Sequence, residues 1–170
     1  MAAVSREPAL ADAVLIAFAE REQGLLVAPG NPLEIASLAD VAAKQARFAM
    51  RPDGAGARQL LEALLRREQL EPGALVAAEG TAPTGPDVAQ AIRAGHADCG
   101  IATRSVAIGA GLPFLPLARE QFDLLMRQRD YFRPPLQALI ALLSSARLVA
   151  RAAELAGLDV TGAGRIRWAP

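Results

Sequence analysis

The chain has 170 residues, of which 52% are hydrophobic and 21% charged, a size and composition typical of one folded domain and far from those of a disordered chain. Its 18 basic and 18 acidic residues balance, so no net charge attracts nucleic acid, an anionic membrane or an acidic protein. A single cysteine, Cys99, excludes an intrachain disulfide and a cysteine zinc cluster.

The N-terminal segment predicts neither export nor membrane insertion. Residues 1–10 include Arg6 and Glu7 and lack the basic start and long apolar run of a secretory signal. No stretch reaches the ~18 uninterrupted apolar residues of a membrane span. We therefore expect a cytoplasmic protein with no membrane partner, unless an upstream targeting segment has been removed. Residues 1–12 are expected to form an N-terminal extension, followed by one ligand-binding domain over residues 13–170.

The first part of that domain predicts strands around a short helix. Apolar runs at 14–19 and 24–28, separated by a polar group, predict either two strands or one bent strand. Ser37 is the predicted N-cap of a short helix over 38–42. A buried strand is expected next, at 47–50.

Two longer helices and a series of shorter elements follow. A glycine-bearing turn at 52–56 leads into a helix over 57–67, where leucines mark one face. After a candidate strand at 74–78, Thr84 opens a helix to about Arg93, with proline in its first turn and an acid three residues on. The remaining predicted elements are a strand at 98–102, a helix at 105–110, strands at 114–117 and 122–126, and helices at 136–142 and 146–155. The arginine-rich segment 127–133 is interpreted as a solvated loop rather than a nucleic-acid patch.

This alternation predicts an α/β fold with a mostly parallel sheet flanked by helices. We assign residues 34–110 to a central α/β lobe, 111–127 to returning strands and 134–157 to closing helices. In sheets of this kind the ligand lies beyond the carboxyl ends of the strands. The connections from strand to helix are therefore where a site is expected.

Two helix starts carry the most chemical interest, because first-turn amides are unpaired donors at the positive end of the helix dipole. The turn Asp53-Gly54-Ala55-Gly56-Ala57-Arg58 combines glycines that allow close backbone approach with an arginine able to reach an oxyanion; the alternative is a plain tight turn. It matches neither a Walker loop nor a dinucleotide fingerprint. Thr81 to Asp87 offers hydroxyls and amides at a second helix start, where a simple N-cap at Thr84 explains the pattern equally well.

Conventional catalytic and metal sites are not predicted. His96 is the only histidine and lies in a polar turn, so neither a catalytic triad nor a histidine metal site can be assembled. Cys99 lies in an apolar strand and is expected to be a small core residue. The carboxylates show no spacing typical of an acid/base pair and are expected to be solvated or capping groups: Glu20, Glu22, Asp53, Asp98 and Asp123.

Four segments together resemble a known family. Residues 21–32, 54–61, 95–101 and 112–124 resemble, in order and with natural spacing over about residues 13–165, the periplasmic-binding-protein-like domain linked to molybdate. That domain often follows a winged helix-turn-helix in bacterial regulators. The resemblance implies a type II binding-protein fold, in which two α/β lobes joined by crossing strands close on a tetrahedral oxyanion held by helix N-termini and hydroxyls. It implies no catalysis and no cofactor.

The sequence departs from the family at both helix starts. The family usually shows Gly-Ser-Gly-Thr-Arg at the first, whereas Ala55 and Ala57 stand at the hydroxyl positions here. A neutral hydrogen bond contributes about 1 kcal/mol and a charged one more, so losing both would weaken an oxyanion site by roughly a hundredfold or shift its preference. At the second start, Thr84-Gly85 stands where the family commonly has threonine followed by histidine.

The resemblance therefore implies a non-enzymatic binding or sensor domain for a small anion such as molybdate or tungstate. The ligand-binding residues that it implies are Gly54, Ala55, Gly56, Ala57, Arg58, Thr81, Thr84 and Gly85. The alternative is a regulatory or dimerisation module of a transcription regulator that no longer binds the oxyanion. A third hypothesis, an enzyme acting on an organic anion, lacks a converging nucleophile and base.

The resemblance also begins at the crossing strands, so we expect one lobe plus these strands, with the first lobe largely absent. An uncovered lobe face predicts self-association as a homodimer, with Val14 to Ala28 and Phe114 to Met126 near the seam. A DNA-binding domain is expected, if at all, on a longer or separate chain, and no direct nucleic-acid partner is expected for this one.

Overall fold

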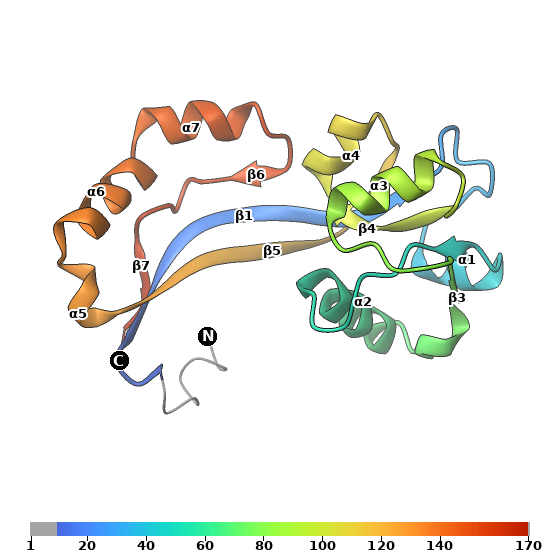
Figure 1. Ribbon diagram of the computed structural model, residues 1–170, viewed down its shortest axis with the longest axis horizontal. Helices are drawn as coiled ribbons and strands as arrows, with labels where there is room; N and C mark the ends of the chain where they lie inside the picture. The colour runs from blue at the N-terminus through green and yellow to red at the C-terminus, as the bar shows by residue number, and fades with distance from the viewer. Residues whose placement is uncertain (1–9, 170) are drawn as a thin grey trace. The chain divides into compact units, whose positions relative to one another are not determined.

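The computed structural model describes residues 10–169, so most of the extension predicted over residues 1–12 lies outside the described residues. The chain forms two compact units, whose elements are labelled in Figure 1. The central unit is Glu22–Ala118, and the terminal unit joins the residues up to Arg21 to those from Arg119 onward. Two long strands, β1 (Ala13–Val27) and β5 (Phe114–Arg127), continue from one unit into the other.

The central unit alternates short strands with helices. Its elements between the two long strands are α1 (Leu38–Ala43), β2 (Arg47–Phe48), α2 (Gly56–Arg67), the 3₁₀ turn η3 (Pro72–Ala74), β3 (Val76–Ala77), α3 (Gly85–Arg93), β4 (Cys99–Thr103) and α4 (Arg104–Ala110). The strand order is β3-β2-β4-β1-β5. β2 runs parallel to β3 and to β4, whereas β1 runs antiparallel to β4.

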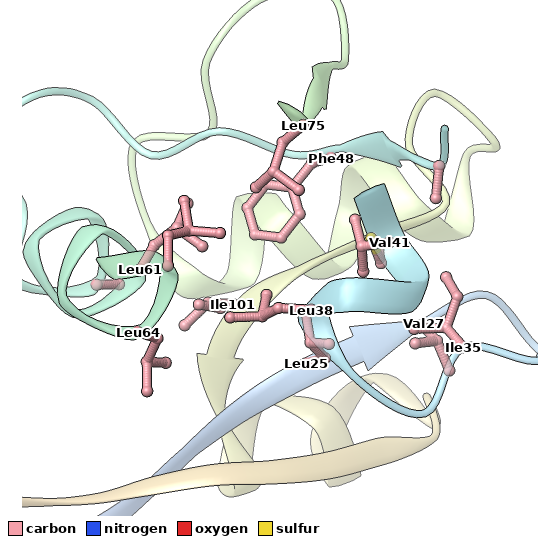
Figure 2. Close-up of a cluster of buried hydrophobic side chains, with 14 residues drawn as sticks. Leu25, Val27, Ile35, Leu38, Val41, Phe48, Leu61, Leu64, Leu75 and Ile101 are labelled. Atoms are coloured by element: carbon pink, nitrogen blue, oxygen red, sulfur yellow. The ribbon is translucent and has the colours of Figure 1, made fainter. Parts of the chain in front are cut away.

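Helices cover both faces of this sheet, because successive residues of a strand point to opposite faces. Leu25 and Ile101 belong to a buried cluster with α1 and α2, which Figure 2 shows. Leu26 and Ala102 pack instead with α3 and α4. In Figure 1 the two helix pairs lie on opposite sides of β4. The predicted α/β class, with helices flanking a sheet, is confirmed.

The terminal unit has a buried core of its own. Its helices and strands after β5 are α5 (Gln128–Tyr131), α6 (Pro134–Leu143), α7 (Ala146–Ala153), β6 (Leu158–Asp159) and β7 (Ile166–Trp168). Val14, Ile16 and Leu143 belong to its buried cluster. Within residues 10–169 no single helix is long and apolar enough to cross a membrane; α6 and α7, bent by 51°, meet that test as a pair by length and composition only.

The sheet is less parallel than the sequence predicted. Of the pairings described, those of β2 with β3 and with β4 are parallel, and those of β1 with β4, β6 and β7 are antiparallel. β6 and β7 were not predicted, because strands of two and three residues are too short to produce a recognisable alternation of apolar and polar positions. The segment predicted as a loop over 127–133 contains the short helix α5.

The strands predicted on either side of residues 20–23 form one strand, β1, which is one of the two options that the sequence left open. The two strands predicted between residues 114 and 126 are likewise one strand, β5, and here the prediction was wrong. The polar residues in the middle of these two strands do not interrupt them, because they form ion pairs from one strand to the other. In the terminal unit, Arg21 Nε lies 2.9 Å from Glu120 Oε2, an ion pair that local sequence does not reveal.

Gly24 allows β5 to approach β1 closely within the central unit. A Cβ atom at this position would lie 2.2 Å from the carbonyl oxygen of Leu115 and 2.6 Å from the ring of Phe114. A backbone oxygen cannot move away cheaply, so this close approach needs a residue without a side chain.

Candidate functional site

Three helices of the central unit begin at one edge of its sheet. β2, β3 and β4 are parallel, so their carboxyl ends lie at the same edge. α2 follows β2, α3 follows β3, and α4 begins directly after β4. In parallel α/β sheets this edge is where ligands bind, because the unpaired amides of the helix starts collect there.

Backbone hydrogen bonds hold two of these connections side by side. The amide of Ala78 donates to Phe48 O at 2.9 Å, and that of Ala82 donates to Met50 O at 2.8 Å. The connection that leads into α2 therefore runs beside the connection that leads into α3. On the other side of β2, the amide of Ala49 donates to Cys99 O at 2.8 Å.

The start of α2 has no side-chain cap. Its N-cap residue is Ala55, whose backbone is extended and whose methyl group cannot accept a hydrogen bond. The preceding Gly54 has φ of +81°, a conformation that favours glycine, and the site where its Cβ would stand is open. First-turn amides have no partner within a helix, so those of Gly56 and Ala57 are donors without a side-chain acceptor from the N-cap.

Arg58 is less available to a ligand than its position suggested. Its Nε lies 2.9 Å from Glu62 Oε1 and 3.9 Å from Asp53 Oδ1, and its Nη1 lies 3.0 Å from Met50 Sδ. Two carboxylates therefore offset its positive charge. Ala57 is 8% exposed and belongs to the apolar cluster under α2, so its side chain contributes to the core.

At the start of α3, the carboxylate of Asp87 lies where an anion would bind. The hydroxyl of Thr84 donates to Asp87 Oδ2 at 2.6 Å, and the backbone amide of Thr84 donates to the same oxygen at 2.8 Å. The amide of Asp87 in turn donates to the Thr84 hydroxyl, which completes a capping box. The sequence left open whether Thr84 is a simple N-cap, and it acts as one in this structure.

Gly85 has a packing reason to be glycine. A Cβ atom there would lie 3.3 Å from Val106 Cγ2 and 3.5 Å from Ala102 Cβ. The missing side chain therefore lets α3 approach α4 and β4 closely. No ligand is needed to explain this residue.

A cavity of about 290 Å³ lies along α3 and the connection that precedes it. Its lining includes the polar residues Glu79, Thr81, Gln90 and His96 together with several alanines. Of the eight predicted site residues, Thr81 lines this cavity and the other seven do not. The structure therefore places the eight residues at one edge of the sheet without gathering them into this cavity.

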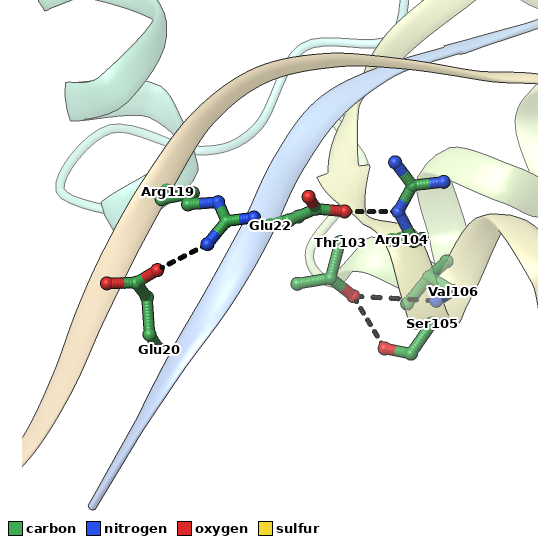
Figure 3. A network of polar contacts seen from close by, with 7 residues as sticks. All are labelled: Glu20, Glu22, Thr103, Arg104, Ser105, Val106 and Arg119. Carbon is green, nitrogen blue, oxygen red and sulfur yellow. Dashed lines mark hydrogen bonds and ion pairs between the residues drawn. The ribbon is translucent and has the colours of Figure 1, made fainter. Parts of the chain in front are cut away.

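Sequence reasoning missed a polar cluster at the start of α4, which Figure 3 shows. Thr103 is the N-cap, and its hydroxyl lies 3.0 Å from that of Ser105. Arg104 pairs with Glu22 of β1 and stacks 4.6 Å above the ring of Phe114. The signal was present in the sequence, because a Thr-Arg-Ser run directly follows the apolar strand. Figure 3 also draws the pair Arg119–Glu20, which belongs to the terminal unit.

The candidate catalytic groups have structural surroundings. Burial raises the pKa of the Cys99 thiol to about 12, so the thiolate nucleophile is not populated near neutral pH. The Arg47 side chain, hydrogen-bonded to Asp98, lowers the pKa of that carboxyl, and the Arg47 amide binds the same carboxylate at 2.8 Å. His96 is exposed. In the described part of the chain no group of three or more His, Cys, Asp or Glu side chains could hold a metal ion.

Comparison with known proteins identifies the family. The sequence profile described as a PBP superfamily domain matches residues 2–144, and the chain belongs to this family. The fold is the type II periplasmic-binding-protein fold, as the sequence resemblance implied. A curated relative, the uncharacterized protein YvgK of Bacillus subtilis (strain 168), is 28% identical over 152 residues. That match covers 89% of this chain and 49% of YvgK, so the chain spans about half the length of this relative.

Solved structures with the same fold include several at low sequence identity. PEB3 bound to L-phospholactate has a TM-score of 0.65 at 16% identity, covering 92% of this chain and 74% of that one. The regulatory domain of Synechocystis PCC6803 CcmR in complex with 2-PG has a TM-score of 0.62 at 16% identity, covering 81% and 68%. The tungstate ABC transporter from Geobacter sulfurreducens has a TM-score of 0.61 at 16% identity, covering 82% and 67%. These similarities establish the fold.

Proposed function

We propose that this chain is a non-enzymatic ligand-binding or sensor domain for a small anion with a tetrahedral oxyanion group, such as molybdate, tungstate or a phosphoryl group. The observation that carries the proposal is the start of α2, which opens on the ligand-binding edge of the sheet with amides that no side chain caps. α1 and α3 both have an aspartate at their third residue, whereas α2 has Arg58 there. A cation is unfavourable next to a helix N-terminus, and here the carboxylates of Glu62 and Asp53 offset the charge of Arg58.

The relatives agree with this ligand class. Tungstate and L-phospholactate, named for two proteins of the same fold, both carry a tetrahedral oxyanion group. Such a group accepts hydrogen bonds from several backbone amides at once, as a helix start provides. This shared chemistry supports an oxyanion group as the feature that the domain recognises.

The absence of catalysis is part of the proposal. The thiol of Cys99 is buried with a raised pKa, and Asp98 is tied to Arg47, so neither is available to attack or to transfer a proton. One protein of the same fold is an ancestral amino-acid-binding protein described as a precursor of cyclohexadienyl dehydratase, which shows that the fold also leads to enzymes. Turnover of a bound organic anion would contradict this part of the proposal.

A second candidate function is a regulatory or dimerisation module that has lost its ligand. Ala55 and Ala57 in place of hydroxyl residues, and the neutralised Arg58, favour it. Self-association is supported by Phe122 and Leu125 of β5, which are 43% and 46% exposed. The first half of the predicted seam is a poorer candidate, because β1 is buried along most of its length. A cytoplasmic location and a DNA-binding domain elsewhere remain part of this proposal.

Gly56→Pro tests the anion site with little structural cost. Proline is favoured as the first residue of a helix, and the extended Ala55 before it suits a proline neighbour. The substitution removes one first-turn amide donor and leaves α2 in place. Isothermal titration of the wild type with molybdate, tungstate, sulfate, phosphate and L-phospholactate should show saturable binding of at least one. The proline variant should bind that anion about tenfold more weakly, for the loss of one charge-assisted hydrogen bond.

Arg66→Ala in the exposed last turn of α2 is the matched control and should leave the affinity unchanged. Light scattering on the same samples reports the oligomeric state. No binding of any of the five anions by a folded dimer would favour the second candidate function. Gain of affinity in Ala55→Ser would show that the site has degenerated and that its geometry is retained.

A further inference from the structure

Arg51 lies where the connections into α2 and α3 meet. It follows Met50, whose carbonyl accepts a hydrogen bond from the amide of Ala82 at 2.8 Å. Its Nη2 donates to the carbonyl of Pro83 at 2.8 Å. The guanidinium of Arg51 therefore bridges two segments that lie at the carboxyl edge of the parallel strands, one residue before the cap of α3.

Arg51 differs from the neighbouring Arg47 and Arg58 in its ion pairing. Within residues 10–169 no carboxylate forms an ion pair with it, whereas Arg58 pairs with Glu62 and Arg47 pairs with Asp98. The Nε–H of Arg51 is buried and has no hydrogen-bond partner among the described residues. A buried guanidinium donor without an acceptor is costly, and it requires an explanation.

A bound oxyanion would supply the missing acceptor. The guanidinium group presents several N–H donors in a fixed plane that matches carboxylate and phosphoryl oxygens. The bond to Pro83 holds this group in place, so little side-chain freedom is lost on binding. The sequence pointed to Arg58, because that residue stands in the glycine turn, but in the structure carboxylates pair with Arg58, whereas no ion pair to Arg51 is found within residues 10–169.

We infer that Arg51, rather than Arg58, supplies the positive charge that binds the oxyanion group of the ligand. The inference rests on the proposed function and adds a specificity-determining residue to it. A purely structural role, tying the two connections together through Pro83, is the alternative. It predicts a loss of thermal stability without a selective loss of anion affinity.

The experiment compares wild type, Arg51→Gln, Arg51→Lys and Arg58→Gln by isothermal titration with tungstate, L-phospholactate and L-lactate. Arg51→Gln should lose at least tenfold in affinity for both oxyanion probes, and Arg51→Lys should lose less, because it keeps the charge. Arg58→Gln should lose less than Arg51→Gln. A larger loss with L-phospholactate than with L-lactate would show that Arg51 contacts the phosphoryl group.

Thermal unfolding without ligand separates folding from binding. A tungstate-induced rise in Tm that is present in wild type and reduced in Arg51→Lys supports the inference even where Arg51→Gln folds poorly. Equal affinities of wild type and Arg51→Gln, or a greater loss in Arg58→Gln, would overturn the inference and leave the proposed function standing. Failure of the wild type to bind either oxyanion would overturn both.

Discussion

The starts of α2 and α3 lie at the same edge of the sheet, and the sequence predicted both as anion sites. They differ in what fills them. At α3, the side chains of Thr84 and Asp87 form a capping box, whereas at α2 the cap is an alanine and the third residue is an arginine. A helix start with a capping box is therefore the poorer ligand site, because a carboxylate and a hydroxyl of the chain already lie where an anion would bind.

The largest expected effect is at Ala57. A substitution there tests whether this residue belongs to the core or contacts a ligand. Ala57→Thr adds two heavy atoms to a packed cluster and should reduce the free energy of unfolding by about 1–3 kcal/mol. Urea denaturation measures this loss. The matched control is Ala63→Thr on the exposed face of α2. This variant should lose only the stability that follows from the lower helix propensity of threonine. Equal losses in the two variants would show that Ala57 faces solvent or a ligand.

Removing the cap of α3 should have the next largest effect. Thr84→Ala eliminates the hydroxyl that accepts from the Asp87 amide and should cost about 1 kcal/mol in the free energy of unfolding. Thr81→Ala, an exposed threonine outside the capping box, should change stability by less than about 0.5 kcal/mol. If both substitutions prove neutral in urea denaturation, α3 is not held by this box.

Giving α2 the cap that it lacks should stabilise the protein. Ala55→Ser places an acceptor at the N-cap and should raise the free energy of unfolding by about 0.5–1 kcal/mol in a buffer without oxyanions. Tungstate at saturating concentration should reduce this gain, since ligand and serine compete for the same amides. A gain that is independent of tungstate would place the anion elsewhere.

The smallest expected effect is a change in acid stability at α1, where Ser37 is the N-cap and Asp40 is the third residue. The amide of Ala36 and the hydroxyl of Ser37 lower the pKa of Asp40 below its ordinary value of 3.8. A lowered pKa in the folded state gives stability that is present above pH 3.8 and is lost as the pH falls through the folded value. Asp40→Asn should therefore flatten the fall in Tm below about pH 4. An unchanged acid profile would exclude this carboxylate as its cause.

Local patterns predicted the helices well, because their starts are encoded locally. Ser37 and Thr84 cap the helices that they were expected to cap, and the leucines of α2 face the core. The burial of Ala57 was also predictable, since it precedes Leu61 and Leu64 by four and seven residues on one helical face. The fold class followed from this alternation and from the family resemblance.

Features that depend on distant residues were not predictable. The length of β1 and β5 depends on pairs such as Arg21–Glu120, whose members are far apart in the chain. The neutralisation of Arg58 was within reach, because Glu62 is one helical turn away. The absence of an ion pair to Arg51 among the described residues could not be predicted, because no sequence motif contains this residue. Its hydrogen bond to Pro83 joins two separate connections.

The uncapped first turn of α2 has a consequence for motion. A helix whose terminal amides lack acceptors frays more readily, so hydrogen exchange should be faster in the first turn of α2 than in that of α3. An anion bound to these amides would take the place of the missing cap and slow that exchange. Recognition of the ligand and ordering of the helix would then be the same event, which gives a sensor its signal without a movement of domains.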